Sequence, residues 1–169
     1  MKTLFVSALT LLLPIIGFSE TNQENSKPSA PSYRFDGKKL LLSDKEWKEK
    51  LSPAQYLTLR KSKADAPYSG AYCYTTKKGT YLCAGCELPV YSSETKYDSG
   101  TGWATFFAPI HSTNISFRKD SHYKKYEIVC SRCEGHLGEI FKDGPPPTWM
   151  RHCVDSTAVK FVSSPDQAK

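Results

Sequence analysis

Residues 81–86, with the sequence YLCAGC, and residues 130–133, with the sequence CSRC, each place two cysteines three positions apart. A tight turn across such a pair aims both thiols at one point, and two pairs supply the four thiolates of a closed tetrahedral zinc site. The sequence therefore predicts a structural zinc ion, whose ligands are Cys83, Cys86, Cys130 and Cys133. The two pairs lie further apart than in a simple zinc ribbon, which predicts that a whole β-domain lies between them.

Short segments rich in β-forming residues begin at about residue 68 and are separated by Gly, Pro, Ser and Asp. They are residues 80–82, 89–91, 114–117, 126–129 and 158–162. Frequent turn residues without a long periodic helix are typical of an antiparallel fold. We therefore expect a mostly-β domain of antiparallel β-sheets over residues 37–163, followed by a polar tail at residues 164–169.

Two short N-terminal helices are expected before the β-rich part. Ser43 and Ser52 are each followed three residues later by Glu or Gln, which is the pattern of a capping box at a helix N-terminus. The large apolar residues that follow at helical spacing are Trp47, Leu51, Tyr56 and Leu59. We predict that these residues face the core, and we expect Trp149 to be a core residue as well.

The first 19 residues have the composition of a secretory signal peptide. Lys2 precedes an apolar run over residues 4–16, and small residues stand at the minus-three and minus-one positions before Glu20. We predict an exported protein, periplasmic or secreted; the alternative is an uncleaved signal that keeps the protein membrane-tethered. Residues 20–36 are polar and rich in Ser, Asn and Pro, and we expect a disordered linker there.

The formal net charge of +6 is scattered along the chain in pairs such as Lys77-Lys78. Scattered lysines are typical of a solvated surface, so we expect no nucleic-acid partner. The chain carries no nucleotide-binding glycine motif, which predicts that neither a nicotinamide nor a flavin is bound. The length of 169 residues fits one domain with appendages, and we expect a monomer.

Two of the six cysteines, Cys73 and Cys153, lie outside the C-x2-C pairs. In an exported protein the pairs could instead form two local disulfides, although a bridge across two residues is strained and reducible. Cys73 and Cys153 could likewise form a structural disulfide. Arg151 and His152 directly precede Cys153. Because nearby positive charge favours the thiolate, Cys153 is a candidate nucleophile.

From about residue 40 to residue 162 the chain resembles the methionine-R-sulfoxide reductases of the MsrB type. The matching segments are residues 42–47 (LSDKEW), 81–86 (YLCAGC), 92–103 (SSETKYDSGTGW), 135–138 (GHLG), 143–148 (DGPPPT) and 151–153 (RHC). Because these segments occur in the same order around both cysteine pairs, the resemblance is specific. It implies the MsrB-like β-fold.

The resemblance also implies roles for single residues. Cys153 matches the cysteine that attacks the sulfoxide sulfur and becomes a sulfenic acid. Many members carry the second, resolving thiol where this chain has Thr101, so Cys73 is the candidate for that role; the alternative is a spare thiol, with an external reductant acting directly on Cys153. Trp103 matches the tryptophan that holds the substrate's methyl group. His152, beside the nucleophile, is a further candidate for substrate binding.

Two positions depart from the family's active-site pattern. The segment that is typically His-Leu-Gly-His begins with His136 but ends in Glu139 here, and the Asn two residues after the nucleophile is replaced by Asp155. His136 is the implied acid–base residue. A carboxylate beside Cys153 would oppose its ionisation, whereas a protonated Glu139 could give a proton to the departing oxygen. Asp155 could also orient an imidazole. We therefore treat all three as candidate catalytic residues.

The resemblance implies an oxidoreductase that returns methionine-R-sulfoxide in oxidised exported proteins to methionine. Its electrons would come from a thioredoxin-like dithiol reductant acting on a Cys73–Cys153 disulfide. The alternative is a zinc-stabilised module that lost turnover through Glu139 and Asp155 and binds oxidised methionine or methyl-bearing peptides. The joint presence of a nucleophile, a methyl-binding tryptophan and an acid–base histidine favours the enzyme.

Overall fold

The computed structural model describes residues 33–119 and 126–164. The predicted signal at residues 1–19, most of the predicted linker at residues 20–36 and most of the tail at residues 164–169 lie outside the described residues. Across the part of the chain that is described, no helix combines the length and the apolar character needed to cross a bilayer.

Both predicted helices are confirmed. Helix α1 covers Asp44–Lys50 and helix α2 covers Pro53–Lys61, and each begins with a complete capping box, at Ser43 and at Ser52. In each box the serine hydroxyl accepts from the third amide of the helix while the Glu or Gln side chain reaches back to the serine amide. The four predicted core-facing side chains of this region are buried, with exposed fractions of 2–8%. They are Trp47, Leu51, Tyr56 and Leu59.

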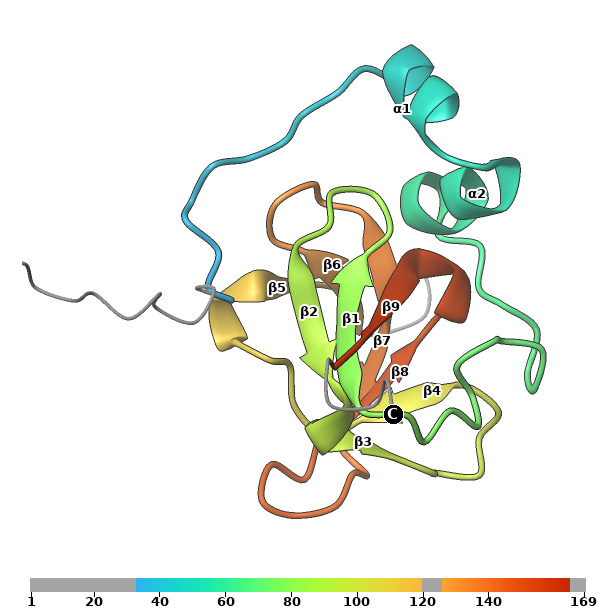
Figure 1. The fold of residues 1–169 in the computed structure, drawn as a ribbon, viewed down its shortest axis with the longest axis vertical. Coiled ribbons are helices and arrows are strands. Elements are labelled where there is room, and N and C mark those ends of the chain that lie inside the picture. Colours follow the sequence, from blue (N-terminus) through green and yellow to red (C-terminus); the bar gives the residue numbers. More distant parts are fainter. Residues whose placement is uncertain (1–32, 120–125, 165–169) are drawn as a thin grey trace, which may run out of the picture. The chain divides into compact units, whose positions relative to one another are not determined.

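The remainder is antiparallel β-structure in two sheets (Figure 1), which confirms the predicted fold class. The smaller sheet has the order β2-β1-β9, built from β1 (Gly79–Cys83), β2 (Pro89–Ser92) and β9 (Val159–Ser163). The larger sheet has the order β3-β4-β8-β7-β6-β5, built from β3 (Lys96–Tyr97), β4 (Ala104–Phe106), β5 (Ile115–Lys119), β6 (Tyr126–Cys130), β7 (His136–Phe141) and β8 (Arg151–Val154). Three short 3-10 turns, η1 (Ser93–Thr95), η2 (Ser112–Asn114) and η3 (Ser156–Ala158), connect these strands.

An aromatic cluster joins the two sheets in the core. Tyr91 of β2 stacks on Phe106 of β4 with ring centroids 4.5 Å apart, and Tyr81 of β1 meets the same phenylalanine edge-on at 5.0 Å. All three side chains have an exposed fraction of 0%. Such aromatic pairs add to the apolar area that they bury, so this cluster anchors β4 and, through it, the neighbouring strand β8.

The expectation that Trp149 is a core residue is wrong, since 65% of this side chain is exposed. Trp149 closes a tight turn in which its amide donates to the Pro145 carbonyl and its own carbonyl accepts from Gly144. Its backbone is left-handed, with φ of 58°. The turn before β8 fixes the backbone of this residue, while the side chain points away from the core.

The register of the larger sheet decides which residues share the face that carries Cys153. Glu127 on β6 pairs with Glu139 on β7, Glu139 pairs with Cys153 on β8, and Cys153 pairs with Thr105 on β4. Residues opposite one another in paired strands project to the same face of a sheet. A single row across four strands therefore brings two glutamates and the candidate nucleophile to one surface.

Gly138 allows β7 and β8 to approach closely beside this row. Its φ is +149°, and an added Cβ would lie only 1.9 Å from the carbonyl oxygen of Cys153. No larger residue fits at this distance without a shift of the backbone. Gly138 in the His-Leu-Gly segment thus allows the close spacing between β7 and β8, the strand that carries Cys153.

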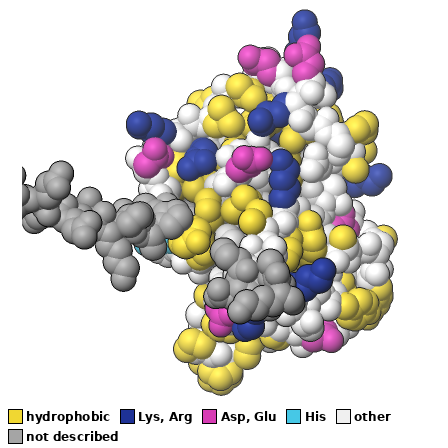
Figure 2. All heavy atoms as spheres, viewed as in Figure 1, with side chains coloured by type: hydrophobic (Ala, Val, Ile, Leu, Met, Phe, Trp, Pro, Cys, Tyr) yellow, Lys and Arg dark blue, Asp and Glu magenta, His cyan; other side chains and the backbone are white. Residues whose placement is uncertain are grey.

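Charges of both signs are interspersed on the face of the molecule drawn in Figure 2. Several lysines pair with acidic neighbours, among them Lys39 with Glu134 and Lys160 with Glu87, each at 3.0 Å. These pairs are largely exposed and contribute little to stability. The excess of lysine is thus partly balanced locally by acidic side chains.

Candidate active site and metal site

The four paired cysteines come together at one point, as their spacing predicts. The sulfur atoms of Cys83, Cys86, Cys130 and Cys133 all lie within 4.8 Å of one another. Two of the separations are 3.5 Å and 3.4 Å, and all four residues are free cysteines. Four sulfurs bound to one tetrahedral zinc ion at about 2.3 Å lie about 3.8 Å apart, whereas a disulfide bond is about 2.05 Å long. The donor set could therefore hold one zinc ion, and it does not have the geometry of two disulfides.

The cluster joins the two sheets and the second helix. Cys83 ends β1 in the smaller sheet, and Cys130 ends β6 in the larger one. Arg132 donates to the Cys86 carbonyl at 3.2 Å, and Arg60 of α2 donates to the Cys133 carbonyl at 2.9 Å. Three of the four cysteines are at most 2% exposed. A closed, buried site of this kind has a structural role.

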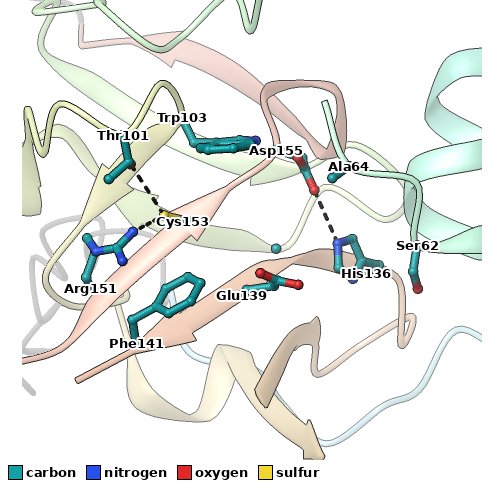
Figure 3. Close-up of a pocket in the computed structure, with 11 residues that line it drawn as sticks. Ser62, Ala64, Thr101, Trp103, His136, Glu139, Phe141, Arg151, Cys153 and Asp155 are labelled. Carbon is teal, nitrogen blue, oxygen red and sulfur yellow. Dashed lines mark hydrogen bonds and ion pairs between the residues drawn. The ribbon is translucent and has the colours of Figure 1, made fainter. Parts of the chain in front are cut away.

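A pocket of about 400 Å³ opens on the face of the larger sheet that carries Cys153. Figure 3 shows its side chains arranged around an open space, with Cys153 toward one end and His136 toward the other. The lining residues are Ser62, Ala64, Thr101, Trp103, His136, Gly138, Glu139, Phe141, Arg151, Cys153 and Asp155. Five predicted site residues thus meet in one pocket, while Cys73 and His152 are not among its lining residues.

Cys153 lies in the pocket with a cation beside its sulfur. Nη1 of Arg151 donates to Cys153 Sγ at 2.7 Å, and the Thr101 hydroxyl lies 3.8 Å from the same atom. Asp143 accepts two hydrogen bonds of 2.8 Å from Arg151 and so fixes the guanidinium. Burial raises the pKa of the Cys153 thiol, and Arg151 and Thr101 oppose this rise without cancelling it. Arg151 is thus the main neighbouring group that favours the thiolate.

His152 points to the opposite face of the sheet from Cys153, because successive side chains of a strand alternate. It is 4% exposed, and its Nδ1 lies 3.0 Å from the hydroxyl of Tyr91. Burial lowers the pKa of His152 to about 4, so its ring is neutral near pH 7. The imidazole next to the nucleophile in sequence therefore brings no positive charge to the thiol.

Cys73 lies in the loop between α2 and β1 and is 5% exposed. It lines a second pocket, of about 320 Å³, together with Lys96 and Tyr97 of β3. Lys96 donates to the carbonyl of Cys73 at 3.0 Å. Thr101 contacts Cys153, whereas Cys73 and Cys153 line different pockets.

His136 is held between two carboxylates. Its Nδ1 donates to Glu127 at 2.7 Å, and its Nε2 donates to Asp155 at 3.2 Å. Burial alone would lower the pKa of His136, but the bonds to Asp155 and Glu127 outweigh this and raise it to about 9. Burial would raise the pKa of Glu127, but His136 and Arg118 lower it to about 2. The ring is therefore an imidazolium at neutral pH, with both N–H groups bound.

Trp103 and Phe141 complete the lining of the pocket, and Glu127 reaches the site through its bond to His136. The indole Nε1 of Trp103 donates to the backbone carbonyl of Asp65 at 3.2 Å. The ring of Phe141 lies against Arg151, with 4.2 Å from the guanidinium carbon to the ring centroid. Glu127 and Phe141 were not identified as site residues from the sequence. No local pattern indicates them, because they reach the site only through the pairing of β6, β7 and β8.

Comparison with known proteins identifies the domain. The SelR domain family matches residues 51–163, which is more than half of the chain. The chain belongs to the SelR domain family. The peptide methionine sulfoxide reductase MsrB of Methanosarcina mazei is 42% identical over 133 residues, which cover 78% of this chain and 95% of that protein. The protein of the same name from Leptospira interrogans is 44% identical over 121 residues, which cover 70% and 92%. The SelR match includes all four clustered cysteines, Cys73 and every residue that lines the pocket.

In this SelR domain the substitution Arg151→Gln tests the ionisation of the nucleophile. Because the guanidinium opposes the effect of burial, its loss raises the pKa of Cys153 further. We propose to measure the rate of alkylation by iodoacetamide against pH in a protein in which Cys73 is replaced by Ser. The midpoint of this profile should lie at a higher pH in Arg151→Gln than in the protein that keeps Arg151. Arg34→Gln, at an exposed position, serves as the matched control. A profile of Arg151→Gln that coincides with that of the control would contradict this role.

The buried imidazolium predicts a particular dependence of stability on pH. The pKa of His136 rises from 6.5 to about 9 on folding, so its contribution is complete below pH 6.5 and is lost as pH rises through about 9. The shift corresponds to about 3 kcal/mol, since a tenfold change in proton affinity is about 1.4 kcal/mol. Urea unfolding of the protein and of His136→Gln should therefore differ most at pH 6 and least above pH 9. An NMR titration of His136 with a midpoint near 6.5 would contradict the account.

Proposed function

We propose that the protein reduces peptide-bound methionine-R-sulfoxide to methionine, with Cys153 as the nucleophile. The observation that carries the proposal is the position of the Cys153 thiol, inside a pocket of about 400 Å³ and in contact with Arg151. The relatives that share 42–44% of their sequence with this chain are named peptide methionine sulfoxide reductases MsrB. The specificity for the R epimer follows the family that the sequence resembles.

The first step transfers the sulfoxide oxygen to the enzyme. The Cys153 thiolate attacks the sulfoxide sulfur and forms a sulfur–sulfur bond. This bond and the sulfur–oxygen bond of the substrate then break as the oxygen passes to Cys153, and one proton is taken up. The products are methionine and a Cys153 sulfenic acid, so the substrate sulfur is reduced and the cysteine sulfur is oxidised. Trp103 offers an aromatic face to the methyl group, since thioether and aromatic groups attract one another.

Glu139 is the pocket residue best placed to supply the proton. It lines the pocket and pairs with Cys153 across β7 and β8. Both N–H groups of His136 are engaged by Glu127 and Asp155, which supports an orienting role for this ring over direct proton donation.

The second stage returns Cys153 to the thiol. In the proposal, the Cys73 thiol condenses with the sulfenic acid, which forms a disulfide and releases water. A thioredoxin-like dithiol protein then reduces this disulfide and is itself oxidised to a disulfide. Both cysteines are free thiols that line different pockets, so their sulfur atoms have to approach each other for the bond to form.

Zinc is the ion we assign to the four-cysteine cluster, where it stabilises the fold and takes no part in the chemistry. The apolar run and small residues at the start of the sequence support export, and oxidised exported proteins are then the substrates. We propose that the enzyme acts as a monomer.

Turnover of each diastereomer of N-blocked methionine sulfoxide tests the proposal. With dithiothreitol, the full-length protein should reduce the R form, Cys153→Ser should reduce neither form, and Cys73→Ser should keep its activity. With a thioredoxin-like protein as reductant, Cys73→Ser should lose multiple turnover, because it cannot form the disulfide that the reductant opens.

Three other outcomes would change or contradict the proposed function. Equal rates for Cys73→Ser with both reductants would remove Cys73 from the cycle and leave Cys153 reduced directly from outside. A folded full-length protein that reduces neither diastereomer would contradict the enzymatic function. Binding of the sulfoxide without turnover would then favour a recognition module.

A further inference from the structure

The loop that follows α2 connects the tryptophan of the pocket to the rest of the site. Trp103 donates its indole N–H to the Asp65 carbonyl at 3.2 Å. The amide of the same residue, Asp65, donates to Asp155 Oδ1 at 2.8 Å. Both bonds are made by the backbone of one loop residue, so a displacement of Asp65 is passed directly to the indole.

Asp155 is itself held firmly. Its side chain is buried, with the residue 2% exposed, and its backbone amide donates to the Leu137 carbonyl of β7 at 3.0 Å. Its second oxygen, Oδ2, accepts from His136 Nε2 at 3.2 Å. One carboxylate therefore serves two partners, with one oxygen directed to the loop and the other to the imidazolium.

The loop also forms hydrogen bonds with the turn that follows Asp155. The carboxylate of Asp65 accepts from the Thr157 amide at 3.1 Å and from the Thr157 hydroxyl at 2.6 Å. These bonds and the Asp155 bond close a reciprocal clamp between the loop and η3. A clamp with three hydrogen bonds, each accepted by a carboxylate oxygen, holds a surface loop more firmly than bonds between neutral groups would.

We propose that Asp155 is a positioning residue that sets the orientation of Trp103, and with it the fit of the substrate's methyl group, through the backbone of Asp65. The inference rests on the proposed function for the role of Trp103, while the chain of hydrogen bonds is independent of it. Asp155 does not itself touch the methyl group. It acts at a distance of two hydrogen bonds, from the strand pair that also carries Cys153.

The two oxygens of Asp155 can be tested separately. Asp155→Asn keeps an oxygen that accepts from the Asp65 amide but removes the negative charge beside His136. Asp155→Ala removes both acceptors. If the bond from the Asp65 amide to Asp155 orients Trp103, Asp155→Asn should leave the orientation of the indole unchanged. Asp155→Ala should free the indole to change its orientation. Glu87→Gln, which changes an exposed carboxylate paired with Lys160, is the matched control.

The first readout needs no substrate. In the full-length protein, the NMR resonance of the Trp103 indole N–H and its exchange with solvent report the bond to Asp65. Asp155→Ala should shift this resonance and speed its exchange, while Asp155→Asn and Glu87→Gln should leave both as in the unchanged protein. Thr157→Val, which removes one hydroxyl of the clamp, should shift the resonance in the same direction by a smaller amount. This variant also keeps the test possible if Asp155→Ala does not fold.

The second readout is substrate selection. For Asp155→Ala the KM for N-blocked methionine-R-sulfoxide should rise about tenfold, the change expected for the loss of about one hydrogen bond. The preference for the S-methyl substrate over its S-ethyl analogue should fall with it, and in Thr157→Val, which changes a residue outside the pocket lining, the rate of Cys153 alkylation should stay unchanged. A merely structural role would alter alkylation together with KM.

Two results would overturn the inference. One is an indole resonance that stays in place in both Asp155→Ala and Thr157→Val. The other is an equal effect of Asp155→Asn and Asp155→Ala on KM and on the resonance, which would assign the effect to the charge beside His136. If the full-length protein shows no turnover at all, the proposed function fails, while the indole measurement still decides whether Asp155 holds Trp103.

Discussion

Four sulfur atoms drawn from two hairpins are the constraint on which the rest of the structure depends. Cys83 and Cys86 come from the β1–β2 turn, and Cys130 and Cys133 come from the β6–β7 turn, so the cluster ties the smaller sheet to the larger one. Strand β7 begins three residues after Cys133. The turn at the cluster therefore fixes where β7 starts, which residues of β7 face the pocket, and how β8 with Cys153 lies beside it.

Electrostatics then divide the pocket into two ends. Arg151 stands at the Cys153 end, where it opposes the effect of burial on the thiol pKa. At the other end the imidazolium of His136 is bound by Glu127 and Asp155. The side chain of Asp155 has two hydrogen-bond partners, the His136 ring and the backbone amide of Asp65 in the loop after α2.

The sequence was informative where the determining signals are local. The capping boxes at Ser43 and Ser52 and the spacing of the paired cysteines predicted two helices and the metal-ligand cluster, because these features depend on residues a few positions apart. Strands β7 and β8 were not predicted, since their mixed polar and apolar residues become strands only through pairing with neighbours. The contact of Glu127 with His136 and the direction of His152 follow from that pairing and were out of reach for the same reason. The contacts of Asp65 depend on how the loop after α2 packs against η3, which is also a long-range feature.

Zinc content measured together with thermal unfolding tests the dependence on the cluster most directly. We predict about one zinc ion per chain in the full-length protein, little or none in Cys130→Ser, and a clear loss of thermal stability in that variant. Cys73→Ser, which removes a buried thiol outside the cluster, should keep its zinc. A full-length protein that holds no metal and unfolds at the same temperature as Cys130→Ser would contradict the central claim.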